Sequence, residues 1–119
     1  MKTSKTDFQL FKDECQKWIK FWGLLNWDIV YNLEPIEGGN LAETSIKMFD
    51  HIATIVLNKD VKTDIDRIKR ASFHEIEELR FARLRELANT RFMNPNDIQE
   101  AIHEIIVQNE NCIFQTYKS

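Results

Sequence analysis

The sequence predicts a single α+β domain in which a small sheet follows an N-terminal helix and precedes two further helices. Apolar residues recur at steps of three and four over residues 7–22, 63–88 and 95–114, the spacing of amphipathic helices. Residues 27–58 instead alternate apolar and polar residues in short runs separated by turn residues, as strands do. A chain of 119 residues can bury one hydrophobic core but not two. We therefore expect one domain over residues 1–119.

The composition is that of an ordinary globular protein, with 43% hydrophobic and 29% charged residues and a net charge of −3. Because charges of both signs are interspersed, we expect no nucleic-acid partner. No apolar run is long enough to cross a membrane, and the first residues lack the apolar stretch of a secretory signal. Cys15 and Cys112 lie outside any C-x-x-C spacing, so we interpret them as core residues in a reducing compartment. We expect a cytoplasmic protein without membrane contact.

The first helix is expected from Thr6 or Asp7 to Gly23. Its apolar face is formed by residues spaced at three and four: Phe8, Phe11, Cys15, Trp18 and Trp22. Ser4 or Thr6 can cap its start, and Gly23 can end it.

Three strands are expected at residues 27–33, 42–49 and 52–58. The Gly38-Gly39-Asn40 segment separates the first two, and Asp50-His51 suggests a hairpin turn before the third, which is the richest in β-branched residues. Short connections between successive strands favour a small, mainly antiparallel three-stranded sheet.

Two helices complete the prediction. Thr63 and Asp66 have capping-box spacing and open a long helix to about Ala88, and Asn94 followed by Pro95 opens the last one. The core stripe expected for the long helix is Ile65, Ile68, Ile76, Leu79 and Leu87. The core stripe expected for the last helix is Ile98, Ile102, Ile105, Ile106 and Ile113.

The long helix contains His74-Glu75-Ile76-Glu77-Glu78, which differs from the zinc-peptidase motif H-E-x-x-H only in that Glu78 replaces the second His. Residues four apart project from the same helical face, so His74 and Glu78 can bind one ion. Glu75 can then act as the general base toward a metal-bound water. Small and apolar neighbours suggest that this side of the helix is covered by protein: Ala71, Phe81 and Ala82.

Structural alternatives exist for the same residues. His74 and Glu78 can form a hydrogen-bonded pair, or Glu78 can bind an arginine from a short list: Arg80, Arg83 and Arg85.

His103 in the last helix is the candidate third ligand, since it is expected to point toward protein. With His74 and Glu78 it would form the His₂Glu set of catalytic zinc. Glu100 or Glu110 could replace or supplement His103, and His103 could instead be an interface histidine. The Glu100-x-x-His103 spacing also occurs in di-iron proteins, but these need two such pairs on four helices.

Four segments carry a resemblance to a known family: Trp27-Asp28-Ile29, residues 53–58, the motif at residues 74–79, and residues 97–104. In this order the chain resembles a minimal zincin metallopeptidase, in particular the small zincin-like proteins of phages and prophages. The resemblance implies a minimal zincin-like fold, Zn²⁺, residues 74 and 78 as ligands with a third from the following helix, and Glu75 as general base. It also implies that the strand before the motif helix borders the active-site cleft, so we expect a peptide or protein substrate at the edge of residues Ile52 to Asn58.

Two functions follow from these observations. One is a zinc-dependent hydrolase of peptide bonds, in which metal-activated water attacks the carbonyl. The other is a catalytically inactive zincin-fold protein that acts as a phage-type interaction or regulatory module in the host cytoplasm. The sequence predicts no particular substrate and no oligomeric state.

Overall fold

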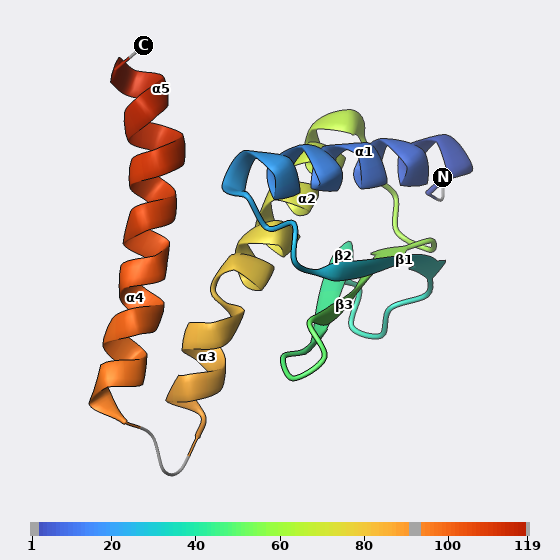
Figure 1. Cartoon of the computed structure of the whole chain (residues 1–119). Helices are drawn as coiled ribbons and strands as arrows, with labels where there is room; N and C mark the ends of the chain where they lie inside the picture. Colours follow the sequence, from blue (N-terminus) through green and yellow to red (C-terminus); the bar gives the residue numbers. More distant parts are fainter. Residues whose placement is uncertain (1–2, 91–93, 119) are drawn as a thin grey trace.

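The computed structural model describes residues 3–90 and 94–118 and confirms the α+β class. The elements follow the chain in this order (Figure 1): α1 Lys5–Trp22, β1 Asp28–Glu34, β2 Ala42–Lys47, β3 Ile52–Asn58, α2 Ile65–Arg80, α3 Ala82–Ala88, α4 Pro95–Asn109, a π-helical turn Glu110–Phe114, and α5 Gln115–Lys118. We call α1, the sheet and α2 the body, and α3 through α5 the C-terminal arm.

Helix α1 begins and ends where its capping residues predict. The Ser4 side chain accepts a hydrogen bond from the Asp7 backbone N–H, and the Asp7 carboxylate accepts one from the Ser4 N–H. Gly23 ends the helix in the left-handed region at φ 71°, which a glycine adopts without strain. The buried face includes Phe11 and Cys15, so the predicted stripe is confirmed there.

The sheet is mixed rather than mainly antiparallel, with strand order β1-β3-β2. Strand β3 runs parallel to β1, with Asp28 opposite Ile52, and antiparallel to β2, with Ala42 opposite Leu57. The connection after β1 takes the chain to the far edge, and β3 returns between the other two strands. The most apolar strand thereby takes the central position, where neighbours cover both of its edges.

This order corrects one prediction. Residues Ile52 to Asn58 were expected to offer an exposed edge to a peptide, but every residue of β3 is paired with β1 and most are also paired with β2. In the described part of the chain, the outer edges of the sheet belong to β1 and β2. Any strand added to this sheet must pair with one of those two.

Helices α1 and α2 pack against each other and lie on one face of the sheet (Figure 1). The core between them is formed by side chains that are at most 4% exposed: Phe11, Cys15, Ile19, Ile55, Leu57, Ile68, Ile76 and Leu79. The predicted stripe of α2 is therefore correct at Ile68, Ile76 and Leu79. It is wrong at Ile65, which is 63% exposed on the first helical turn.

The long helix expected to end at Ala88 is divided in two. Phe81 has φ −94° and ψ 7°, which ends α2 at Arg80 and lets α3 begin at Ala82. Its start also differs from the prediction, because Asp64 rather than Thr63 is the N-cap and accepts a hydrogen bond from the Arg67 N–H. The break changes the direction of everything that follows α2.

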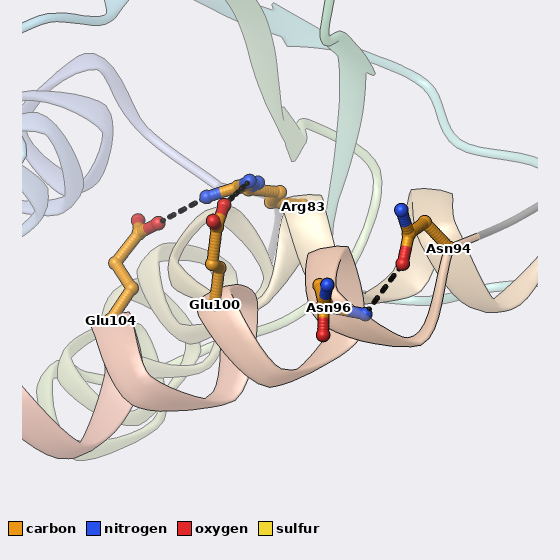
Figure 2. A network of polar contacts seen from close by, with 5 residues as sticks. All are labelled: Arg83, Asn94, Asn96, Glu100 and Glu104. Carbon is orange, nitrogen blue, oxygen red and sulfur yellow. Dashed lines mark hydrogen bonds and ion pairs between the residues drawn. The ribbon is translucent and has the colours of Figure 1, made fainter.

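Buried Arg80 joins the body to the arm at this break. Its guanidinium lies 3.6 Å from the centre of the Trp22 ring and donates a 2.7 Å hydrogen bond to Asn109 Oδ1 on α4. Below this junction, Arg83 of α3 binds Glu100 and Glu104 of α4 at 3.2 and 3.3 Å (Figure 2).

The arm stands beside the body, and α4 continues through the π-helical turn into α5 (Figure 1). The predicted cap of α4 is confirmed, since Asn94 Oδ1 accepts from the Asn96 N–H (Figure 2). Its predicted core stripe is wrong at Ile102, Ile106 and Ile113, which are 43%, 48% and 53% exposed. The side of α4 turned to the rest of the chain buries Ala101 instead, where α4 packs against α3.

None of the helices in residues 3–90 and 94–118 is both long enough and apolar enough to cross a bilayer.

Candidate functional site

The motif helix borders a hollow of about 460 Å³ beside the start of β2. Its wall is formed by residues from the β1–β2 connection, β2 and α2: Asn40, Leu41, Ala42, Arg67, Arg70, Ala71, His74 and Glu75. Ala42 of the outer strand β2 borders this hollow together with His74 and Glu75 of the motif. A hollow next to an open strand edge can hold a peptide in extended conformation.

Glu75 is the buried member of the motif, at 5% exposure. Loss of solvation raises the pKa of its carboxyl group. A 2.7 Å hydrogen bond from the Thr44 hydroxyl and the neighbouring His74 each lower this pKa in part, and the charge of Glu43 raises it. A carboxyl group with a raised pKa at a hollow is a candidate for proton transfer near neutral pH. Its placement fits the predicted role of general base.

Thr44 was missed by the sequence analysis, although a signal for it was present. Residues 42–47 alternate, and the structure places Ala42, Thr44 and Ile46 on the less exposed side of β2. A hydroxyl on that side of an edge strand can donate to a carboxylate on the neighbouring helix. This contact fixes the orientation of the Glu75 carboxylate.

His74 and Glu78 meet as predicted, with His74 Nε2 3.6 Å from Glu78 Oε1. Residues 3–90 and 94–118 do not provide the cover expected over this pair, since the side chain of His74 is 69% exposed and that of Glu78 is 29% exposed. Glu78 Oε2 also binds Arg85 of α3. One structural alternative is thus realised, since Glu78 has an arginine partner, whereas the 3.6 Å between His74 and Glu78 is too long for the hydrogen bond of the other.

The third predicted ligand lies elsewhere. His103 projects from α4 as an exposed residue and borders a separate hollow of about 550 Å³ with Arg83, Glu100 and Glu104. It was expected to point toward protein, and the structure corrects that expectation. Glu100 is bound to Arg83, and exposed Glu110 begins the π-helical turn after α4. These residues lie in the C-terminal arm, which follows the break at Phe81, and not in the body with the motif.

A single chain therefore brings together two of the three predicted zinc ligands, His74 and Glu78. In residues 3–90 and 94–118, no group of three or more His, Cys, Asp or Glu side chains is placed to hold a metal ion. The His74–Glu78 pair does fit one: two ligands about 2.1 Å from a tetrahedral Zn²⁺ are about 3.4 Å apart, close to the observed 3.6 Å. Histidine and carboxylate are also ligand types that zinc accepts.

Comparison with protein-family models, curated proteins and solved structures finds no match to this chain.

Proposed function

We propose that this protein is a zinc-dependent hydrolase of peptide bonds, with His74 and Glu78 as metal ligands and Glu75 as general base. The observation that carries the proposal is the combination of buried Glu75, whose pKa is raised, with an exposed His–Glu pair of ligand spacing in the same helix. The open edge of β2 beside them supplies a place for an extended substrate.

Each residue has a distinct task in this proposal. Bound zinc would polarise the scissile carbonyl and acidify a water molecule. Glu75 accepts the proton of that water. Its raised pKa makes its carboxylate a stronger base than that of an ordinary glutamate. Thr44 holds the Glu75 carboxylate through the 2.7 Å hydrogen bond and thereby limits its rotation.

Metal analysis of protein purified without a histidine tag tests the proposal. We expect about one zinc ion per chain, lost in His74→Ala and in Glu78→Ala. The matched control is His51→Ala, since His51 lies in the β2–β3 turn and stacks on Trp27 with 4.6 Å between ring centres. Zinc that stays after His74→Ala, or leaves only after His51→Ala, contradicts the assignment.

Hydrolysis of a denatured, unlabelled protein such as casein tests the reaction itself. We expect Glu75→Gln to keep its zinc and to lose at least about 100-fold in rate, because general-base catalysis contributes that much or more. Glu86→Gln changes an exposed glutamate of α3 and should leave the rate unchanged. Equal rates for wild type and Glu75→Gln would rule out the role of Glu75.

A second candidate is a catalytically inactive protein of this fold that binds an extended peptide along β2. It is favoured by the lack of a three-ligand group in the described part of the chain. Under this candidate, wild type and Glu75→Gln bind an extended peptide equally and neither cleaves it. Cleavage by the wild type alone decides for the hydrolase.

We further propose that the protein works in a reducing cytoplasm. Cys15 and Cys112 are both free thiols, which supports this compartment. A phage or prophage origin rests on the resemblance alone.

A further inference from the structure

The hollow between α2 and the start of β2 carries an excess of cationic groups. Arg67 and Arg70 border it together with His74. The described wall includes one carboxylate, that of Glu75, which is 5% exposed and accepts the hydrogen bond of the Thr44 hydroxyl. Because the whole chain has a net charge of −3, this excess is a local property of the hollow.

The two arginines of the hollow differ from the other arginines that the structure describes, because neither binds a carboxylate. Arg67 donates to the Lys62 backbone carbonyl at 3.0 Å, and the Arg70 guanidinium makes no hydrogen bond or ion pair within residues 3–90 and 94–118. The other three each bind a glutamate: Arg80 binds Glu77, Arg83 binds Glu100 and Glu104, and Arg85 binds Glu78. A guanidinium has five N–H donors in a planar fork that matches a carboxylate. Most of the donors of Arg67 and Arg70 therefore remain for a ligand.

These cationic groups lie on the side of α2 that an added strand would face. Arg67, Arg70 and His74 follow one another at steps of three and four residues, so they share one side of the helix. Helix α2 packs on the sheet face to which Thr44 of β2 points, since Thr44 donates to Glu75. Strand β2 is an outer strand, and alternate side chains of a peptide added to it, about 7 Å apart, would point to that same face. They would therefore meet the hollow between β2 and α2.

The charge of the hollow decides which side chain it accepts. A carboxylate can take paired, charge-assisted hydrogen bonds from a guanidinium, whereas a lysine side chain would be repelled by two arginines. We infer that the hollow binds an aspartate or glutamate side chain of an extended peptide that pairs with β2, with Arg70 and Arg67 donating to its carboxylate. The inference rests on the proposed placing of a peptide along β2, and it requires no bound metal.

Calorimetric titration of the full chain, dialysed against EDTA, tests the charge preference. The probes are blocked peptides of about six residues, the usual length of a strand, in which threonine alternates with glutamate, glutamine or lysine. We expect the glutamate peptide to bind at least roughly tenfold more tightly than the glutamine peptide, because only its side chains are charged. Arg70→Ala should remove most of this difference, and Arg70→Glu should favour the lysine peptide instead.

The matched control is Arg83→Ala, which changes an arginine of the arm and should bind the glutamate peptide as wild type does. Circular dichroism confirms that each variant is folded. Three results overturn the inference: no binding of the glutamate peptide at about 1 mM, equal affinity for the glutamate and glutamine peptides, or a folded Arg70→Ala with the full preference of wild type.

Hydrogen exchange tests the position of the peptide. Pairing with β2 should slow the exchange of backbone amides within Ala42–Lys47, because the added strand accepts hydrogen bonds from the outer edge. Binding without slower exchange in β2 means that the arginines hold a carboxylate elsewhere and overturns the inference. The same follows if acetate displaces the peptide at an equal concentration, since the site is then one for a simple anion.

The inference and the proposed hydrolase fail in different experiments. A glutamate peptide that binds with the expected preference but is not cleaved by the zinc-loaded protein supports the inference and contradicts the hydrolase. Cleavage of casein by a protein that binds all three peptides equally overturns the inference and leaves the hydrolase intact.

Discussion

The body and the C-terminal arm are built on different principles. In the body, α1, β3 and α2 bury side chains such as Phe11, Ile55 and Ile76 completely. In the arm, α4 buries Ala101 and is attached by hydrogen bonds and ion pairs of Asn109, Glu100 and Glu104. Burial of apolar surface dominates folding free energy, whereas exposed ion pairs add little. The body is therefore expected to supply most of the free energy of folding, and the arm, most of whose apolar side chains stay exposed, to supply little of it.

The largest difference between the two regions is expected in the loss of stability when one isoleucine of each is shortened to alanine. Ile76→Ala leaves a cavity in the core and should lower the free energy of unfolding by about 2–5 kcal/mol. Ile106→Ala removes a half-exposed side chain and should cost less than about 1 kcal/mol when measured on single copies. Urea unfolding followed by circular dichroism, at a concentration where light scattering detects one copy, gives both values. Equal losses would show that the arm has a core of its own.

The next effect concerns Arg80, which joins the two regions. Arg80→Met keeps part of the packing on Trp22 but removes the hydrogen bond to Asn109, so we expect a loss of roughly 1–3 kcal/mol. Arg85→Met, on the exposed side of α3, is the control and should cost much less. Urea unfolding measures both. If Arg80→Met is as stable as wild type, the arm is independent of this junction.

The same comparison shows which parts of the fold the sequence predicts. Within the body, residue spacing and capping identify α1, β3 and the buried side of α2, because each of these signals is local. Strand order is not local: the parallel pairing of β1 with β3 depends on segments about 24 residues apart. Alternation of residues within each strand carries no information on which strand takes the centre.

In the arm, an apolar stripe was mistaken for a buried one. The spacing places Ile102 and Ile106 on one side of α4 and Ile113 in the turn that follows it, but it does not predict which surface covers these side chains. The candidate site likewise has one part that local spacing predicts and one part that it does not. A separation of four residues correctly places His74 beside Glu78, whereas the position of His103 depends on the break at Phe81, which no residue pattern announces.

A smaller effect should distinguish buried Glu75 from the exposed glutamates of the arm. Because burial raises its pKa above the ordinary value of 4.5, the folded state favours the protonated carboxyl and loses stability as the pH rises through that pKa. Glu75→Gln should therefore match wild type below pH 4.5 and become progressively more stable than wild type as the pH rises above that value. Urea unfolding at a series of pH values measures the difference.

The control for this titration is Glu86→Gln on α3, which changes an exposed side chain. The gain of Glu75→Gln is measured relative to this variant at each pH. Thr44→Val provides a second check, since removal of the hydrogen bond to the carboxylate should raise the pKa of Glu75 further. A Glu75→Gln variant with no pH-dependent gain would show that the carboxyl is well solvated.

The smallest effect is expected at Arg83, which binds Glu100 and Glu104 across the arm. The three side chains are 41%, 66% and 46% exposed, so water and salt screen their attraction (Figure 2). Arg83→Ala should lower the free energy of unfolding by only about 0.2–1 kcal/mol per ion pair, and by less in 1 M salt. Urea unfolding at low and high salt measures the contribution of these ion pairs to the free energy of unfolding. Arg67→Ala, which changes an exposed arginine of the body, is the matched control. A loss as large as that of Ile76→Ala would mean that these ion pairs contribute as much to stability as the buried core of the body.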